Sequence, residues 1–286
     1  MTIVVTGATG HLGRLIVDAL LRDGVAPSDI VAGGRNVDSL SDIAGRGVKV
    51  LRIDYDAPST LKAAFEGADT LMLVSASEPG KRVPQHKAAI DAAVAAGITR
   101  IVYTSAPKAR TSHLILAPEH KATEELLEAS GIATTILRNG WYTENYAGAA
   151  RQAAESGELV SSVGDGRVAS ASRKDYADAA AVVLGSAGHE GKVYELSGDV
   201  AWTQADLAAA ISTVTGKTVV YTPVSTEQHE AILRSSGLDE GTIGFVTTLD
   251  SNIADGVLAE TSGELRELIG RPTTPLVEGL AAALQS

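Results

Sequence analysis

The chain contains no cysteine and few aromatic residues. The absence of cysteine among its 286 residues excludes disulfides, thiol nucleophiles and thiolate metal sites. Phe, Trp and Tyr together make up 4% of the chain, so adjacent aromatic side chains are uncommon in it. The six histidines form no pair at the spacing of metal ligands, and we expect no metal site.

Long hydrophobic runs and an excess of basic charge are missing too. No apolar run approaches the length of a membrane span, and the first apolar strand begins too early to leave room for a targeting segment. The formal net charge of −11 disfavours partners rich in phosphate, such as nucleic acids and anionic membranes. We therefore expect a cytoplasmic protein that binds neither nucleic acid nor a membrane.

A glycine-rich turn follows the first apolar run of the chain. The run Ile3–Val5 leads into Gly7-Ala8-Thr9-Gly10-His11-Leu12-Gly13. In a dinucleotide-binding loop with this order of strand, turn and helix, the three glycines permit a sharp turn, close approach of a pyrophosphate and close helix packing. The pyrophosphate would then sit on the free N–H groups of a helix that begins near His11. The alternative is a tight strand-to-helix connection that binds nothing.

Arg35 directly follows the second apolar run, Ile30–Gly34. In a dinucleotide-binding fold this position faces the adenosine ribose. A carboxylate there accepts a hydrogen bond from the ribose 2′-hydroxyl of NAD, whereas a guanidinium matches the 2′-phosphate of NADP. Arg35 therefore favours NADP over NAD, and the alternative is an arginine that only faces solvent.

Apolar runs and alanine-rich amphipathic stretches alternate through the first half of the chain. Together with the glycine turn, this alternation predicts an α/β fold of Rossmann type, with a doubly wound parallel sheet. We expect residues 1–150 to form the NADP-binding domain. The expected strands lie at Ile3–Thr6, Ile30–Gly34, Val48–Ile53, Thr70–Val74, Arg100–Thr104 and Thr134–Leu137, and the expected helices at Leu12–Leu21, Leu61–Phe65, Gln85–Ala96 and His120–Ala129.

The pattern loosens in residues 151–286, which we expect to form a smaller, mostly helical C-terminal lobe that binds the substrate. Asp175 is expected to cap a helix over Asp175–Leu184. A later strand at Val193–Leu196 is expected to rejoin the main sheet. Because ligands bind at the carboxyl ends of parallel strands, the active site is expected in the cleft between sheet and lobe.

Small and aromatic residues follow two of the later strands. The small residues Ser75-Ala76-Ser77 would let the cofactor ribose approach the backbone. Trp141 and Tyr142 can stack on a planar substrate, or else they fill the gap between sheet and lobe. Arg173 can reach a phosphate or face solvent, and the lone histidine His86 is expected to be structural.

The segment Thr6–Gly13 has the form Thr-Gly-x-x-Gly-x-x-Gly and resembles the short-chain dehydrogenases/reductases. Members with a Tyr-x-x-x-Lys pair use the tyrosine as proton donor, but no tyrosine of this chain has a lysine four residues later. Ser105 stands near the position of the family serine without that tyrosine. This departure is typical of the atypical NmrA-like branch, which the chain resembles over nearly its whole length. The most specific segments are Ser77–His86, Leu137–Tyr146, Gly188–Leu196 and Leu268–Thr274.

The resemblance implies an NADPH-dependent quinone reductase. We expect Asn139 to hold the nicotinamide end of the cofactor, His11 to act only as a backbone donor, and Trp141 and Tyr142 to wall the substrate site. The residues that the resemblance implies at the cofactor are Gly7, Ala8, Thr9, Gly10, His11, Leu12, Arg35, Ser75, Ala76, Ser77, Asn139, Gly140, Trp141, Tyr142, Thr143, Glu144 and Arg173.

Quinone chemistry is compatible with the missing proton donor. Hydride addition to a quinone yields a hydroquinone monoanion, which resembles a phenolate with a pKa of about 10. Water can protonate this anion afterwards, whereas a secondary alkoxide needs a proton in the transition state. Two alternatives stay open: a non-catalytic protein that senses NADP(H), and a reductase of triphenylmethane dyes or of another planar acceptor.

Overall fold

The computed structural model describes residues 1–78 and 80–285. Pro79, which belongs to one of the segments named above, lies outside the described residues, as does Ser286. The chain forms two compact units. Unit 1 comprises residues 1–110, 118–139 and 173–195, and unit 2 comprises residues 111–117, 140–172 and 196–286. The chain therefore passes from one unit to the other several times.

Unit 1 is built on a seven-stranded sheet with the strand order β3-β2-β1-β4-β5-β6-β9. Neighbouring strands are parallel; Ile3, for example, lies beside both Ile30 and Thr70. The order reverses between β1 and β4, which is the switch point where doubly wound sheets bind their ligands. The strands are β1 (Ile3–Val5), β2 (Ile30–Gly34), β3 (Lys49–Arg52), β4 (Thr70–Leu73), β5 (Arg100–Ser105), β6 (Ala133–Asn139) and β9 (Val193–Leu196).

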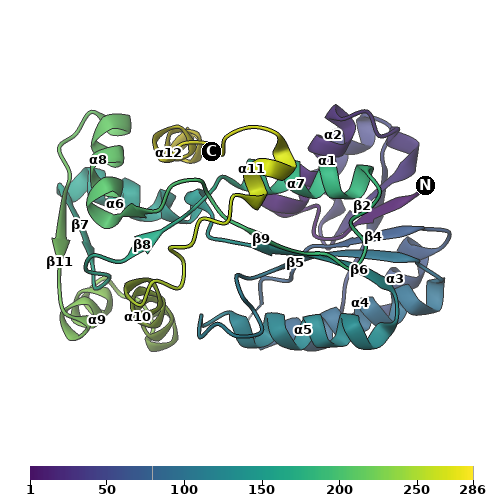
Figure 1. Cartoon of the computed structure of the whole chain (residues 1–286), viewed down its shortest axis with the longest axis horizontal. Coiled ribbons are helices and arrows are strands. Elements are labelled where there is room, and N and C mark those ends of the chain that lie inside the picture. The colour runs from purple at the N-terminus through teal and green to yellow at the C-terminus, as the bar shows by residue number, and fades with distance from the viewer. Residues whose placement is uncertain (79, 286) are drawn as a thin grey trace. The chain divides into compact units, whose positions relative to one another are not determined.

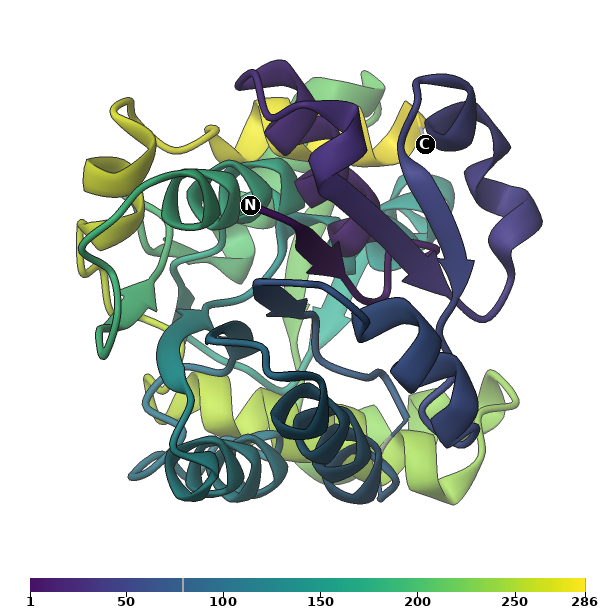
Figure 2. The same ribbon diagram turned by 90° about the vertical axis from the view of Figure 1, so that its right-hand side faces the viewer.

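Helices cover both faces of this sheet, as Figures 1 and 2 show. Helices α1 (His11–Arg22) and α7 (Arg173–Gly185) pack together on one face, while α3 (Pro58–Phe65), α4 (Arg82–Ala96) and α5 (Ala117–Ser130) lie on the other. The short helix α2 (Ser41–Gly45) precedes β3. The prediction of a doubly wound α/β fold is confirmed.

The core between the sheet and the second helical face follows the period of two along each strand. Leu71 and Leu73 of β4, and Ile101 and Tyr103 of β5, point into this core and are fully buried. They pack against apolar side chains of α3, α4 and α5, among them Phe65. Strands β1, β2 and β4 are buried along their whole length, and this explains why they read as continuous apolar runs.

One sequence-based detail in unit 1 is wrong. Helix α7 begins at Arg173, so Asp175 lies in its first turn and does not precede the helix as a cap. The aspartate is fully buried there. A carboxylate in the first turn interacts favourably with the positive end of the helix dipole, as a capping residue also does, so the sequence signal is similar in the two cases.

Unit 2 is mostly helical. Two of its helices begin with reciprocal side-chain caps: Thr203 with Asp206 before α8, and Ser225 with Gln228 before α9. Two helices, α6 and α10, and the three short strands β7, β8 and β10 had no clear sequence signal. The elements are α6 (Ala147–Ser156), β7 (Glu158–Ser161), β8 (Arg167–Val168), β10 (Trp202–Thr203), α8 (Gln204–Thr215), β11 (Val220–Pro223), α9 (Thr226–Ser235), α10 (Glu240–Ala254), α11 (Glu264–Ile269) and α12 (Leu276–Gln285).

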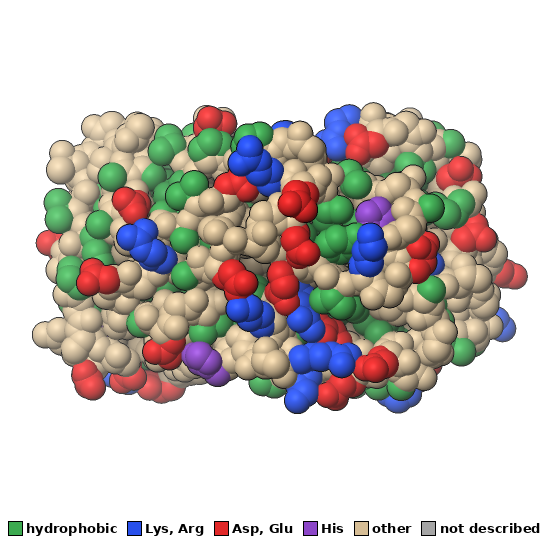
Figure 3. Space-filling view, viewed as in Figure 1, with side chains coloured by type: hydrophobic (Ala, Val, Ile, Leu, Met, Phe, Trp, Pro, Cys, Tyr) green, Lys and Arg blue, Asp and Glu red, His purple; other side chains and the backbone are tan. Residues whose placement is uncertain are grey.

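The surface and the helix lengths bear on membranes. Within residues 1–78 and 80–285, no helix combines the length and the apolar character needed to cross a bilayer. On the face seen in Figure 3, acidic and basic side chains are intermingled with apolar ones.

Candidate dinucleotide-binding site

The glycine turn after β1 has the backbone that the sequence predicts. Gly7 adopts a φ of +62°, a conformation that side chains rarely permit. A Cβ atom on Gly13 would collide with the Gly7 carbonyl and the Ala8 backbone, so this glycine lets the helix approach the turn closely. The turn is closed by a hydrogen bond from the Gly10 N–H to the Gly7 carbonyl oxygen at 2.9 Å.

The N-terminus of α1 fits a pyrophosphate. Gly10 is the N-cap residue, and no side chain caps the helix. Thr9, Gly10 and His11 are exposed. The first N–H groups of a helix need partners from outside the helix, and together with the helix dipole they attract an anion. The turn therefore presents backbone donors that a dinucleotide would satisfy.

Strand β2 brings a second element to the same edge. Gly34 ends this strand, and a Cβ atom there would collide with the side chain of Thr9, so the glycine allows the turn to pack on β2. Arg35 follows at once, and 66% of its side chain is exposed. Its Nη1 donates to Oε1 of Glu78 at 2.6 Å. The turn and Arg35 thus lie at the carboxyl ends of neighbouring strands.

The backbone of the segment Ser75–Ser77, after β4, is held by hydrogen bonds to three side chains. The Ser75 N–H donates to Oγ1 of Thr104 at 2.8 Å. The Ala76 N–H donates to Nε2 of His86 at 2.9 Å, and the Ala76 carbonyl accepts from Nε of Arg82 at 2.8 Å. Both backbone polar groups of Ala76 are therefore occupied by side chains of α4. The structural role expected for His86 has this geometric basis.

The hydrogen bonds of His86 determine which ring nitrogen carries the proton. Because Nε2 accepts from Ala76, the hydrogen is on Nδ1, which lies 2.9 Å from Oγ1 of Thr123. The Thr123 hydroxyl donates onward to the Glu119 carbonyl at 2.9 Å. Burial, followed by the charges of His120 and Arg82, lowers the pKa of His86 to about 3. Burial also lowers the pKa of His120 to about 3. Both rings are neutral in the folded chain at neutral pH.

These two histidines predict a loss of stability in mild acid. The unfolded chain takes up protons on them below a pH of about 6.5, while the folded chain resists until about 3, so stability is complete above 6.5 and falls towards 3. Each histidine is expected to cost about 2 kcal/mol of unfolding free energy between pH 7 and pH 5. Urea unfolding followed by circular dichroism at several pH values measures this slope.

Two variants separate the contribution of His86 from other titrations. His86→Gln places a non-titrating acceptor near the Ala76 N–H and should remove about half of the acid-dependent loss. His113→Gln is the matched control, since the His113 side chain is 63% exposed. Equal pH slopes in wild type and His86→Gln would contradict the assignment.

A buried ion-pair network surrounds Ser105, the residue near the family serine position. Its hydroxyl donates to Oε1 of Glu124 at 2.7 Å. The same carboxylate accepts from Nε and Nη2 of Arg138 at 2.9 and 2.7 Å, and Arg138 in turn bonds Glu195 at 2.7 Å. Burial alone would raise the pKa of Glu124, but the bonds from Arg138 and Ser105 outweigh it and lower the pKa. Ser105 thus has a structural partner.

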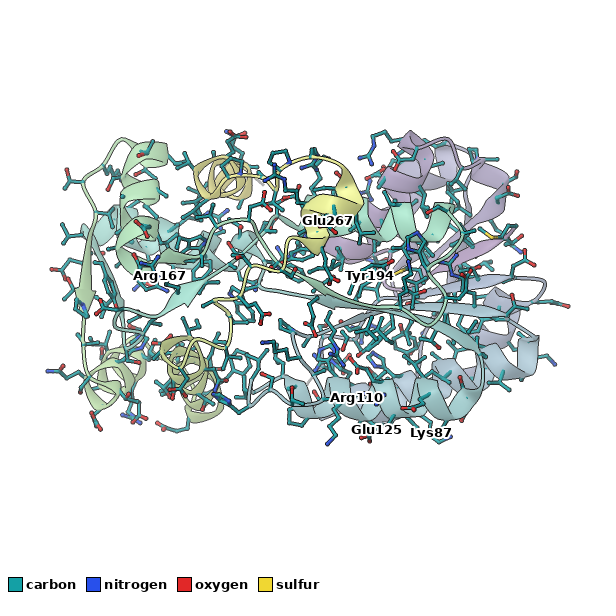
Figure 4. The ribbon with its side chains drawn as sticks, in the orientation of Figure 1. Lys87, Arg110, Glu125, Arg167, Tyr194 and Glu267 are labelled. Carbon is teal, nitrogen blue, oxygen red and sulfur yellow. The ribbon has the colours of Figure 1, made fainter. Side chains whose placement is uncertain are left out.

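Arg110, labelled in Figure 4, adds a more exposed cation to this network. Its Nε lies 3.2 Å from Glu124 and its Nη2 lies 2.7 Å from Glu128. The loop after β5 is further held by the Lys108 N–H, which donates to Oε2 of Glu195 at 3.0 Å. The network therefore fixes the loop that leaves the carboxyl end of β5.

The segment after β6 is divided between the two units. Asn139 ends β6 in unit 1 and is buried. Gly140, Trp141, Tyr142, Thr143 and Glu144 belong to unit 2. There Trp141–Thr143 pairs with Ala171, because the Ala171 N–H donates to the Trp141 carbonyl and the Thr143 N–H donates to the Ala171 carbonyl.

The structure thus gathers part of the predicted site within unit 1. The turn Gly7–Leu12, Arg35 and Ser75–Ser77 come together at the carboxyl ends of β1, β2 and β4, and Arg173 begins α7. Sequence reasoning missed Glu78 and Glu124, since the partner of Glu78 and several partners of Glu124 are distant in sequence. In the described residues, no group of three or more His, Asp or Glu side chains is arranged to hold a metal ion.

The fold and the turn define a dinucleotide-binding protein of the Rossmann type, and the sequence assigns its family. The profile of the NmrA-like family matches residues 1–254, and the chain belongs to this family. It is 46% identical over 279 residues to quinone oxidoreductase 2 of Escherichia coli K12, an alignment that spans 98% of this chain and 97% of the relative.

Two solved structures are similar over the whole chain. The NADPH-dependent quinone oxidoreductase of E. coli, complexed with NADPH, matches with a TM-score of 0.94 and 46% identity, over 98% of this chain and 99% of that chain. The triphenylmethane reductase of Citrobacter sp., complexed with NADP(H), matches with a TM-score of 0.93 and 39% identity, over 99% and 100%. The predicted resemblance to the NmrA-like proteins is confirmed.

Proposed function

We propose that this protein is an NADPH-dependent oxidoreductase that reduces quinones or similar planar, electron-poor acceptors. The observation that carries the proposal is the open glycine turn at the switch point of the sheet, in a chain that is 46% identical to an NADPH-dependent quinone oxidoreductase. We further propose that it acts in the cytoplasm and, in keeping with its net charge of −11, that it has no nucleic-acid partner.

Residues of unit 1 would make most of the contacts with the cofactor. The N–H groups at the start of α1 would bind the pyrophosphate, Arg35 the 2′-phosphate, and the anchored backbone of Ser75–Ser77 the ribose. Asn139 would hold the nicotinamide end, and Arg173 together with the backbone of the segment Gly140–Glu144 would complete the cofactor contacts. NADPH, when bound, supplies a hydride, and the protein orients it.

The substrate wall is proposed from Trp141 and Tyr142. Pairing with Ala171 fixes the backbone of this segment. Flat side chains on a fixed backbone can hold a planar acceptor, and positioning of this kind lowers a barrier by up to about 7–11 kcal/mol. The sequence-based assignment of cofactor binding to residues 1–150 and substrate binding to residues 151–286 stays a prediction.

No proton donor from the protein is required for this reaction. The family serine position, Ser105, donates its hydroxyl to Glu124, and no Tyr-x-x-x-Lys pair is present in the sequence. A hydroquinone anion is weakly basic, so water can protonate it after the transfer. The arrangement therefore suits an acceptor whose reduced form is a stabilised anion.

The test follows NADPH absorbance with the purified protein and a benzoquinone, a naphthoquinone, an enone and a triphenylmethane dye, with NADH as the control cofactor. We expect NADPH consumption with the quinones. The dye belongs in the panel because the Citrobacter dye reductase is 39% identical to this chain. Tight NADPH binding without consumption across the panel would favour a non-catalytic NADP(H) sensor.

Trp141→Ala should raise the KM for quinone and leave the affinity for NADPH nearly unchanged.

A further inference from the structure

A cluster of three charged side chains, Arg35, Glu78 and Lys81, lies at the carboxyl edge of the sheet in unit 1. Oε1 of Glu78 accepts from Nη1 of Arg35 at 2.6 Å, and its Oε2 lies 3.3 Å from Nζ of Lys81. The two cationic side chains are each 66% exposed, and that of Glu78 is 32% exposed. The carboxylate thus bridges two accessible cations.

The bridging turn is anchored on the rest of unit 1. The Lys81 N–H donates to the Glu78 carbonyl at 3.2 Å, and Gly80 between them has a φ of +79°. The Gly80 N–H donates to Oε1 of Glu119 at 2.9 Å, while Oε2 of Glu119 accepts from Nη1 of Arg82 at 2.7 Å. Helix α5 thereby holds Gly80 and Arg82, the residues on either side of Lys81.

The carboxylate of Asp54 lies in the same region of unit 1 but pairs with residues other than Arg35. Asp54, at the end of β3, accepts from Nη2 of Arg52 at 2.9 Å and from the Asp56 N–H at 3.2 Å. The carboxylate of Glu78, in contrast, forms an ion pair with Arg35. Its pKa is lowered by Lys81 and Arg35, so the bridge is charged at neutral pH.

We propose that Arg35 and Lys81 form a two-cation site for the 2′-phosphate of NADP(H), and that the Glu78 carboxylate occupies this site until the phosphate displaces it. This inference rests on the proposed binding of NADPH and adds to it a second phosphate ligand and an internal competitor. A phosphate carries up to two negative charges and offers three oxygens, so it bonds a guanidinium and an ammonium together better than one carboxylate does.

The two cations make binding selective for NADPH, and the competing carboxylate reduces this selectivity slightly. NADH carries a hydroxyl where NADPH carries the phosphate. Its binding free energy therefore gains little from either cation, and it does not displace the Glu78 carboxylate. NADPH displaces it at a small cost, because an exposed ion pair is weak. Glu78 therefore lowers the affinity for NADPH slightly in exchange for holding the two cations together in the free protein.

The test measures dissociation constants for NADPH and NADH by fluorescence titration of Glu78→Gln and Lys81→Gln, without any acceptor. Glu78→Gln should tighten NADPH binding by about two- to fivefold, since the competing pair is exposed. Lys81→Gln should weaken NADPH binding by roughly tenfold, the lower end of what the loss of one charged phosphate contact produces, because the Lys81 side chain is exposed. Both variants should bind NADH as wild type does.

Matched controls exist on helix α4, where Lys87 and Asp91 form an ion pair whose side chains are 56% and 63% exposed. Lys87→Gln and Asp91→Asn change the net charge equally and should leave both dissociation constants unchanged. The inference is overturned if Glu78→Gln fails to tighten NADPH binding, or if Lys81→Gln affects NADPH and NADH alike. If wild type itself does not bind NADPH, the proposed function fails instead.

Discussion

Replacing Arg35 by alanine is expected to weaken NADPH binding by roughly 10- to 100-fold and to leave NADH binding within about twofold. The loss of one charge-assisted hydrogen bond, about 1.5–3 kcal/mol, corresponds to roughly 10- to 100-fold in affinity, and the fork of the guanidinium matches the geometry of a phosphate. The Arg35 side chain is 66% exposed and bonded to Glu78, so the folded chain needs little from it. The loss should therefore appear in binding and hardly in stability.

Calorimetric titration with NADPH, NADH, and the fragments 2′,5′-ADP and 5′-AMP measures this difference. The fragments isolate the adenosine end of the cofactor from contacts at the nicotinamide. Arg46→Ala serves as the control, because Arg46 is a half-exposed arginine of unit 1 that is paired with Asp18. Equal losses for NADPH and NADH in Arg35→Ala would refute the assignment of Arg35 to the 2′-phosphate.

Replacing Glu124 by glutamine is expected to lower the free energy of unfolding by about 3–5 kcal/mol. The Glu124 side chain is 2% exposed and accepts hydrogen bonds from Ser105, Arg138 and Arg110. Neutralising it leaves the Arg138 guanidinium, 13% exposed, with only part of its compensating charge. For a domain whose total stability is about 5–15 kcal/mol, this loss is severe.

Urea unfolding followed by circular dichroism tests the expectation, and Glu128→Gln is the matched control. Glu128 lies one turn further along α5 and also bonds Arg110, but its side chain is 69% exposed. Its replacement should change the unfolding free energy by less than about 1 kcal/mol. Similar losses in the two variants would show that burial of the network contributes little.

Quinone turnover in a Glu124 variant that is destabilised but still folded would separate a loss of stability from a loss of catalytic activity. Glu124 acts on the loop after β5 through Ser105 and Arg138, and nothing places it on the cofactor. At a temperature where the variant stays folded, we expect the KM for NADPH to resemble that of wild type.

Local patterns in the sequence predicted most of the helices and strands of the first half of the chain. Each expected strand of the first half overlaps an observed one, from Ile30–Gly34, which coincides with β2, to Thr134–Leu137, which lies inside β6. The glycine spacing predicted the turn, because the positive φ of Gly7 and the close approach at Gly13 are requirements of single residues. Unit 2 was harder to read, since strands of two residues such as β8 and β10 are too short to show a period.

The sequence by itself determined the class of fold, the position of the dinucleotide turn and the arginine next to it. These follow from residues close together along the chain, whose spacing alone sets the local backbone. Tertiary structure decided the partners: Arg35 meets Glu78 across 43 residues, and Arg138 meets Glu195 across 57. Such pairs form because parallel strands bring their carboxyl ends to one edge, whatever the separation of those ends in sequence. Spacing carries no information about which side chains meet there, so the competitor on Arg35 and the buried carboxylate on Ser105 became visible only in the folded chain.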